Sequence, residues 1–347
     1  MDVASKLAPS EVPRDLLQRI ADGTQIDSRG CCTMTQAIQT AIYDPDADPR
    51  GPSTDERVSE WCNAARPLAA ESSRLALAQA GVDPREVTHV VTASCTGFAA
   101  PGVDQWLVWD LGLPATCRRT HIGFMGCHAA INALAAADAY ARAAPGAVVL
   151  VTSVEISTVH LHYGARMDRL IANSLFADGS SSAVVTVRGT LPPAAGNGVR
   201  GRAPSQRSPE IALTSSTLMA DTAGEMAWRI GNHGFEMTLN STVPSHLRRE
   251  VGPWIRSVLQ QAGLTPEQVG GWAIHPGGPR IVEAIADTLG LSSERTTLSR
   301  EVLQQHGNMS SATVLFVVKR LHEEGAPLPR LAMSFGPGLA GEALVIV

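Results

Sequence analysis

The chain has 347 residues, of which 44% are hydrophobic and 18% are charged, and its formal net charge is −5. This length and apolar content allow a large buried core, which excludes a mainly disordered chain and predicts two domains or one large layered domain. The slight acidity and the lack of a block of lysine and arginine argue against nucleic acid as the main partner. Because no run of about 18 apolar residues is present, we expect no membrane span.

The N-terminal residues and the cysteines indicate the compartment. The first residues lack the basic segment and apolar stretch of a secretory signal, so we expect a soluble, cytoplasmic protein. The six cysteines are predicted to be free thiols, since a long chain without an export signal rarely depends on disulfides. None of them forms a Cys-x-x-Cys pair, so we expect no structural zinc site.

The first clearly patterned segment spans residues 80–97. Gly81 and Pro84 are typical of a helix end that turns the chain into its next element. The apolar pair Val90-Val91 then predicts a short strand, and the loop that follows it ends at Gly97.

Residues 129–144 are rich in alanine and carry Ile131 and Leu134 at helical spacing, which predicts a central helix packed closely on its neighbours. The apolar run 147–151 is short and follows a Pro-Gly turn, as expected of a strand buried on both faces. Strands that alternate with helices predict a mostly parallel sheet.

The second half of the chain repeats this order of elements at an offset of 262 − 80 = 182 residues. Three identities support the repeat: Gly81 with Gly263, Pro84 with Pro266, and Val87 with Val269. We therefore predict two fused α/β halves. Residues 1–190 and 210–347 form these halves, and the stretch 191–209, rich in Pro and Gly, is the exposed linker.

Cys127 lies in a Gly-Cys-His sequence directly before the predicted helix 129–144. A helix N-terminus offers unpaired N–H groups and the positive end of a dipole, which lower the pKa of a thiol. We therefore interpret Cys127 as a nucleophile, although a small buried hydrophobe is the alternative. The offset of 182 places Cys127 on Met309, next to Asn308, so both loops are expected to face one cavity. Asn308 either caps the next helix or directs its amide at a developing oxyanion.

His275 follows an apolar strand and precedes the sequence Pro-Gly-Gly-Pro. The structural alternative is a strand-end histidine bonded to backbone, but the glycines would let a ligand approach closely, so we interpret His275 as functional. His128 ranks below it, because its side chain is expected to point along the new helix. Cys95 is interpreted as a cavity-wall residue.

Together these motifs resemble the type III polyketide synthases, the chalcone synthase-like family with the thiolase fold. The matching segments occur in the family's order over roughly residues 14–347: Gly126-Cys127, the Leu-Phe-Ala-Asp-Gly at 175–179, the Trp-Ala-Ile-His-Pro-Gly-Gly-Pro at 272–279, the Gly-Asn-Met-Ser-Ser-Ala at 307–312, and the Phe-Gly-Pro-Gly-Leu at 335–339. The resemblance implies an α/β thiolase-like fold with two duplicated halves in a layered αβαβα arrangement.

The resemblance also implies the chemistry. A starter acyl-CoA loads Cys127, and His275 and Asn308 drive the decarboxylative condensation of malonyl-CoA onto it, followed by cyclisation to a pyrone or a phenolic, resorcinol-like product. Phe176 is implied as the gatekeeper between a CoA tunnel and the cavity, and Met237 stands at a second gatekeeping position. Further substrate-binding positions implied are Thr96, Glu155, Ser157, His160, Trp228, Gly336, Pro337 and Gly338. Contacts with CoA are implied for Arg19, Gly277, Gly278 and Arg280.

The implied partners are an acyl-CoA starter, malonyl-CoA and a second copy of the chain in a homodimer, with no metal and no redox cofactor. Trp228 stands where plant members carry a small glycine, and His160 replaces a small hydroxyl residue. We therefore expect a pocket unlike that of chalcone synthase, and a bacterial pyrone- or resorcinol-forming relative is the better analogy.

Three other functions are kept open. A ketosynthase III-like condensing enzyme and a catalytically altered thiolase-fold scaffold would share the fold. A papain-like cysteine hydrolase would share the chain order Cys, His, Asn, but it predicts neither the internal duplication nor the Gly-Pro-Gly loop.

Overall fold

The computed structural model describes residues 7–8, 12–33, 42–44, 48–187 and 209–347. The predicted linker spans residues 191–209, and only its last residue is among the described residues. The elements before the linker are α2 (Arg14–Thr24), α3 (Thr54–Ala80), η1 (Pro84–Glu86), β1 (His89–Ser94), α4 (Val103–Leu111), β2 (Arg118–Gly123), α5 (Ala129–Ala143), β3 (Val148–Ile156), η2 (Ser157–His160), α6 (Met167–Leu175) and β4 (Asp178–Thr186). Those after it are β5 (Ile211–Leu218), β6 (Met226–Gly231), β7 (Gly234–Leu239), α7 (Val243–Gln261), η3 (Pro266–Gln268), β8 (Gly271–Ile274), α8 (Pro279–Leu289), α9 (Ser293–His306), η4 (Ser310–Ala312), α10 (Thr313–Glu323), β9 (Arg330–Gly336), η5 (Pro337–Leu339) and β10 (Ala340–Ile346).

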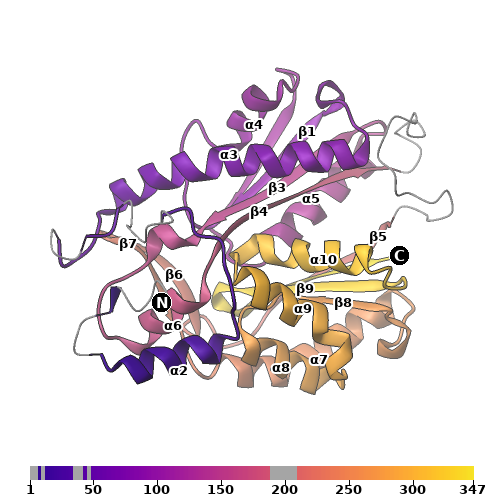
Figure 1. Cartoon of the computed structure of the whole chain (residues 1–347). Helices are drawn as coiled ribbons and strands as arrows, with labels where there is room; N and C mark the ends of the chain where they lie inside the picture. The colour runs from indigo at the N-terminus through magenta and orange to yellow at the C-terminus, as the bar shows by residue number, and fades with distance from the viewer. Residues whose placement is uncertain (1–6, 9–11, 34–41, 45–47, 188–208) are drawn as a thin grey trace.

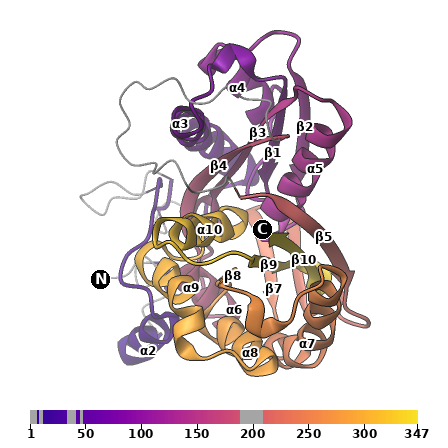
Figure 2. The same ribbon diagram turned by 90° about the vertical axis from the view of Figure 1, so that its right-hand side faces the viewer.

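Helices and sheets alternate in five layers. Two four-stranded sheets have the strand orders β2-β1-β3-β4 and β5-β10-β9-β8, and β6 and β7 form a separate hairpin. Figure 1 shows α3 and α4 above the first sheet, α5 and α10 between the sheets, and α7, α8 and α9 below the second sheet. Figure 2 shows the same layers from the side. The predicted layered αβαβα arrangement is confirmed.

The prediction of a mostly parallel sheet is confirmed for the first sheet, where two of the three strand pairs are parallel, but it is wrong for the second sheet, where two of the three pairs are antiparallel. Strand β1 pairs in parallel with β2 and β3, but β4 joins the sheet antiparallel to β3. In the second sheet only β8 and β9 are parallel, whereas β10 is antiparallel to both β9 and β5. The turn η5 between β9 and β10 is too short for the crossover that a parallel pair requires.

The internal duplication is visible element by element. Adding 182 to the first residues of β1, α5 and β3 gives 271, 311 and 330, and β8, α10 and β9 begin at 271, 313 and 330. The equivalent helix ends also agree, since Gly81 and Gly263 both adopt the left-handed conformation at φ 69°. Each is followed by a short 3-10 turn that begins at a proline.

The central layer explains why the two halves lie so close. Alanines 129, 133 and 137 of α5 and valines 314 and 317 of α10 are fully buried in one apolar cluster with strands of both sheets. Small side chains allow the helices to approach the sheets closely. As a result, the loops that precede α5 and α10 are brought together between the sheets.

Two further expectations concern cysteines and membranes. All six cysteines carry free thiols, as predicted. None of the described helices combines the length and the apolar character that crossing a bilayer requires.

Candidate active site

Cys127 lies in the turn between β2 and α5, directly before the first turn of the helix. Gly126 before it has φ 88°, a left-handed conformation that favours glycine. A Cβ atom at Gly126 would lie 2.1 Å from the Pro337 ring, so only glycine lets the loop after β9 pack here. The half-buried thiol of Cys127 is thereby placed against the second half of the chain.

The thiol of Cys127 is hydrogen-bonded to Ser310, a residue that the sequence pattern does not predict. The Ser310 hydroxyl donates a hydrogen bond to Cys127 Sγ at 3.5 Å, and the Ser334 hydroxyl donates to the Cys127 carbonyl at 2.8 Å. Ser310 has φ 48°, which is uncommon for a residue other than glycine and clusters at functional sites. The signal that could have found Ser310 is its place next to Met309, the residue equivalent to Cys127 in the repeat.

Asn308 connects three segments of the site. Its side chain is buried (1% exposed), its Oδ1 accepts the Ser310 N–H at 2.9 Å, and its Nδ2 donates to the Gly277 carbonyl at 3.3 Å. Its backbone forms a parallel bridge with Phe176. The capping alternative is wrong, because the N-cap residues of η4 and α10 are Met309 and Ala312. The Asn308 Oδ1 instead closes a turn at Ser310, and its amide is directed at the loop after His275.

His275 directly follows β8 and is 2% exposed, and its backbone N–H donates a hydrogen bond to the Met333 carbonyl at 2.9 Å. Within the described part of the chain, both of its ring nitrogens are buried and lack a hydrogen-bond partner. The ring packs on the glycine loop, since a Cβ atom at Gly277 would lie 3.7 Å from Nε2. Unpartnered buried polar atoms are costly and rare, so this imidazole points to a group that arrives with a ligand.

The electrostatics differ from the expectation for a helix N-terminus. Burial raises the pKa of the Cys127 thiol to about 12, although the hydrogen bond from Ser310 acts in the opposite direction. Burial also lowers the pKa of His275 to about 3, and the nearby charge of His128 adds to this shift. The predicted lowering of the thiol pKa was therefore wrong. Without substrate the site holds a neutral thiol and a neutral imidazole.

Two adjoining cavities lie beside Cys127, and neither of them is lined by His275 or Asn308. One, of about 30 Å³, contains Cys127, and the other, of about 390 Å³, extends from it towards α6 and the β6–β7 hairpin. They share four lining residues: Ser157, Phe176, Trp228 and Met237. The smaller cavity is also lined by Cys95, Thr96, Gly126, Met226, Ser310 and Pro337. These four shared residues therefore form the boundary between the Cys127 chamber and the larger cavity.

Most residues predicted to line the cavity do so. Phe176, Trp228, Met237 and Ser157 stand at the boundary, and the Ser157 hydroxyl is buried without a hydrogen-bond partner among the described residues. Thr96 and Pro337 line the Cys127 chamber, and His160 lines the larger cavity. Cys95 lines the wall of the Cys127 chamber, as predicted. Its thiol donates a hydrogen bond to the Gly126 carbonyl, and its sulfur accepts one from the Gly126 N–H.

The remaining predicted residues lie outside the two linings. Glu155 lies behind the wall, where its buried carboxylate accepts hydrogen bonds from the Cys95 N–H at 2.9 Å and the Thr96 hydroxyl at 2.8 Å. Gly336 packs on the His128 ring, and the Gly338 carbonyl accepts from Thr222 at 2.9 Å.

The residues predicted to contact CoA do not line either cavity. Arg19 is an exposed side chain of α2 that pairs with Asp15 at 3.3 Å. Arg280 is exposed at the start of α8, and Gly277 and Gly278 form the loop between His275 and that helix.

Known proteins resemble this chain over most of its length. Residues 8–189 match the family model for chalcone and stilbene synthases, N-terminal domain, and residues 210–347 match the model for the C-terminal domain. The "Alpha-pyrone synthesis polyketide synthase-like Pks18" of Mycobacterium tuberculosis (strain CDC 1551 / Oshkosh) is 32% identical over 304 residues, which cover 85% of this chain and 74% of the relative. The "1,3,6,8-tetrahydroxynaphthalene synthase" of Streptomyces peucetius subsp. caesius is 31% identical over 289 residues, covering 82% and 74%.

Solved structures show the same fold. The crystal structure of PKS-I from the brown alga Ectocarpus siliculosus superposes with a TM-score of 0.89 at 30% identity, covering 99% of this chain and 92% of that one. The C-terminal type III polyketide synthase domain of Steely1 from Dictyostelium has a TM-score of 0.87 at 23% identity, which supports the fold alone. The chain therefore belongs to the chalcone and stilbene synthase family of type III polyketide synthases.

Proposed function

We propose that this protein extends a starter acyl-CoA with malonyl-CoA through a thioester on Cys127, and that it cyclises the product to a pyrone or a phenolic compound. The observation that carries the proposal is the buried, unpartnered imidazole of His275. It is connected through Gly277, Asn308 and Ser310 to the sulfur of Cys127. The reaction uses CoA thioesters as substrates and requires no redox cofactor.

Loading is the first step. The neutral His275 accepts the proton of the Cys127 thiol as the sulfur attacks the thioester carbonyl of the starter. The carbon–sulfur bond to CoA breaks, and the CoA thiolate takes that proton back from the imidazolium. The Ser310 hydroxyl stabilises the negative charge on the sulfur of Cys127 during this exchange.

Decarboxylation is the second step. Malonyl-CoA places its thioester oxygen against a ring N–H of His275 and the amide of Asn308. One hydrogen on Asn308 Nδ2 is bound to the Gly277 carbonyl, and the second is available for this oxygen. Loss of carbon dioxide leaves an enolate, whose oxygen is stabilised by about 3–4 kcal/mol per donor.

Condensation and release complete the cycle. The enolate carbon attacks the acyl carbon on Cys127, a carbon–carbon bond forms, and the sulfur leaves as a thiolate. The product is a β-ketoacyl-CoA longer by two carbons, which can reload Cys127. The larger cavity next to the chamber provides space for the growing polyketide. Relatives named for α-pyrone synthesis and for a tetrahydroxynaphthalene support cyclisation at the end.

The proposal includes the division of the chain predicted from the internal repeat and the assignments carried over from the family. It divides the chain into residues 1–190 and 210–347 around the linker, and it expects a homodimer in the cytoplasm. Phe176 and Met237 act as gatekeepers. The proposed CoA contacts are Arg19, Gly277, Gly278 and Arg280.

The test is to incubate the purified protein with a panel of acyl-CoA starters and malonyl-CoA and to measure carbon dioxide and product masses. Cys127→Ala and His275→Ala are expected to abolish condensed products, whereas the control Cys62→Ala keeps them. Condensed products that persist unchanged in either active-site variant would refute the assignment. A ketosynthase III-like enzyme would accept malonyl groups only from an acyl carrier protein, and a catalytically altered scaffold would form no product with any starter.

A further inference from the structure

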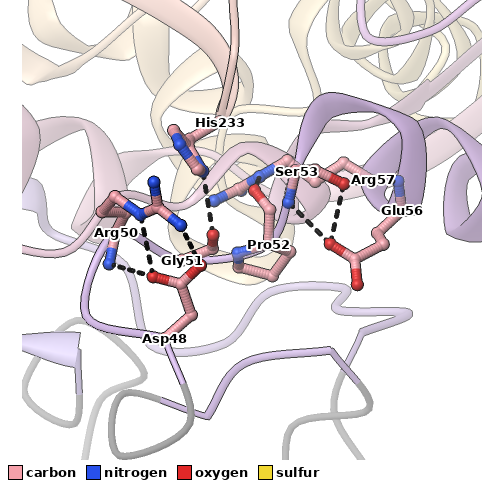
Figure 3. Close-up of polar contacts among 8 residues, drawn as sticks. All are labelled: Asp48, Arg50, Gly51, Pro52, Ser53, Glu56, Arg57 and His233. Atoms are coloured by element: carbon pink, nitrogen blue, oxygen red, sulfur yellow. Dashed lines mark hydrogen bonds and ion pairs between the residues drawn. The ribbon is translucent and has the colours of Figure 1, made fainter.

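Arg57, on the first turn of α3, is fully buried (0% exposed). Its Nε donates to the Pro52 carbonyl at 2.9 Å, and its Nη1 donates to the Leu161 carbonyl at 2.9 Å and to the Val159 carbonyl. Figure 3 shows the guanidinium beside Pro52, between the start of α3 and the segment that carries His233. The protein thus buries a cation against neutral carbonyl groups.

Tyr43 extends this contact to the same backbone segment. Its hydroxyl donates to the Thr158 carbonyl at 2.7 Å and accepts hydrogen bonds from Arg57 Nη1 at 3.0 Å and the Leu161 N–H at 3.1 Å. The Arg57 guanidinium also lies 5.2 Å from the centre of the Tyr43 ring. Arg57 and Tyr43 therefore fix the carbonyl groups of residues 158, 159 and 161, which flank His160 on both sides.

His160 connects this backbone segment to the cavity wall. Its Nδ1 accepts the Phe235 N–H at 3.1 Å, so the ring proton lies on Nε2, which donates to the Thr96 carbonyl at 2.6 Å. The imidazole stacks on the Phe235 ring with centroids 4.0 Å apart and meets Trp228 edge-on at 5.7 Å. His160 and Trp228 line the larger cavity, and Thr96 lines the Cys127 chamber.

The β6–β7 hairpin packs on the same arginine. Gly234 has φ 101°, and a Cβ atom there would lie 2.9 Å from Arg57 Cδ. The Thr54 N–H donates to the Asn232 carbonyl at 2.9 Å, and His233 Nδ1 donates to the Gly51 carbonyl at 3.0 Å, as Figure 3 shows for His233. The hairpin that carries Trp228 and Met237 is therefore anchored beside Arg57.

A buried cation of this kind is weak evidence for stability, because its desolvation cost offsets most of the attraction that it gains. Its planar fork, however, fixes several acceptors in one geometry, which an ammonium or an amide cannot reproduce. The contacts of Arg57 reach two of the segments that form the cavity wall, residues 157–161 and the β6–β7 hairpin, whereas α6 forms a third part of that wall. This placement gives the arginine a positioning role.

We propose that Arg57 is a positioning residue that sets which acyl groups the enzyme accepts, by holding His160 and the β6–β7 hairpin in the cavity wall. The proposal rests on the proposed polyketide synthase function. It assigns Arg57 no contact with the substrate and no part in decarboxylation, which depends on His275 and Asn308.

The experiment compares Arg57→Gln, Arg57→Lys and Tyr43→Phe with the wild type and with Arg50→Gln. Arg50 is a matched control, because it lies in the same region but forms an exposed ion pair with Asp48 at 3.2 Å (Figure 3). For each protein, kcat/KM is measured with acetyl-CoA and decanoyl-CoA as starters, together with the rate of malonyl-CoA decarboxylation without a starter.

Arg57→Gln is expected to change the ratio of the two kcat/KM values about tenfold, the discrimination that a small change in an apolar pocket produces. Decarboxylation is expected to stay close to the wild-type rate, and Arg57→Lys to fall between wild type and Arg57→Gln. Arg50→Gln is expected to keep the wild-type ratio.

An unchanged ratio in the Arg57 variants, or an equal loss with both starters and in decarboxylation, would overturn the proposal and leave Arg57 a purely structural role. If Arg57→Gln does not fold, the same reading applies to Tyr43→Phe, which removes only one hydroxyl. A wild-type protein that forms no condensed product would instead contradict the proposed function itself.

Discussion

The hydroxyl of Ser310 donates to the sulfur of Cys127 across the interface between the two halves of the chain, with an O–S distance of 3.5 Å. Cys127 lies just before α5, and Ser310 begins η4 just before α10, one residue after Met309, which is the repeat equivalent of Cys127. Because the surroundings of Cys127 disfavour a thiolate, this contact is a main local source of stabilisation for the charged sulfur.

Ser310→Ala is therefore expected to raise the pKa of the Cys127 thiol and to slow condensation about tenfold, since a hydrogen bond to a charged group contributes about 1.5–3 kcal/mol and this one is long. The change is followed through the rate of alkylation of Cys127 by iodoacetamide at several pH values between about 7 and 9.5, where the rate reports the small thiolate fraction and should be lower in the variant at every pH. Ser174→Ala is the control, because that hydroxyl bonds to the Leu170 carbonyl within α6. An unchanged alkylation profile would contradict the role of Ser310.

The pKa of His275 predicts the pH profile of decarboxylation. Because burial lowers this pKa to about 3, the imidazole stays neutral well below pH 6. The rate of malonyl-CoA decarboxylation, measured as carbon dioxide release at saturating substrate, is expected to be flat between about pH 5.5 and 8, whereas an unperturbed histidine would titrate near 6.5. A fall in rate with a midpoint near pH 6.5, in protein that remains folded by circular dichroism, would show that His275 is solvated.

The sequence predicts Cys127, His275 and Asn308 as candidate site residues, because each lies in a loop whose glycines or repeat position marks it. The sequence does not predict the role of Ser310, because its left-handed backbone depends on the packing around it. A serine two residues after an asparagine is also typical of an ordinary helix cap. Arg57 looks from the sequence like an ordinary charged residue at the start of a helix. Its burial comes from residues 43, 52, 159 and 161, which only the tertiary fold brings to it.

The two wrong predictions have the same origin. The apolar runs of β9 and β10 are compatible with parallel or antiparallel pairing. Only the short turn between the two strands requires the antiparallel arrangement. The pKa of Cys127 was judged from its own helix, but residues distant in sequence, Phe176 and Trp228 among them, enclose the thiol and determine its solvation.

His160 is expected to make the fold sensitive to acid. Burial and the positive charge of Arg57 hold its pKa at about 3, although its hydrogen bond to the Thr96 carbonyl acts in the opposite direction. Because the unfolded chain binds a proton near pH 6.5 and the folded one does not, the contribution of His160 to stability is complete above pH 6.5 and is lost as the pH falls towards 3. At pH 5 the free energy of unfolding is lower by about 2 kcal/mol for this reason.

His160→Gln can keep both hydrogen bonds of the imidazole, to the Phe235 N–H and the Thr96 carbonyl, but cannot titrate. Urea unfolding at pH 5, 6 and 7 should therefore show a smaller loss of unfolding free energy on acidification in this variant than in the wild type. Equal losses in both proteins would mean that His160 does not contribute to the acid sensitivity.

Trp228 separates the Cys127 chamber from the larger cavity, and its indole N–H fixes it there by donating to the Cys95 carbonyl at 2.8 Å. Trp228→Gly is expected to join the two cavities and to shift the products to longer chains or larger starters, as measured by product masses with a panel of acyl-CoA starters. The same change should cost about 2–3 kcal/mol of unfolding free energy, because a large, partly buried ring is removed.

Trp109→Gly is the matched control, because that ring is 57% exposed on α4 and lines neither cavity. Trp109→Gly should leave the product masses unchanged. A change in product masses that occurs only in Trp228→Gly is then an effect of the cavity wall and not of a general loss of stability. If the Trp228→Gly enzyme folds and makes the wild-type products, the polyketide does not grow into the larger cavity. The Trp228 ring would then serve only to support the Cys95 loop.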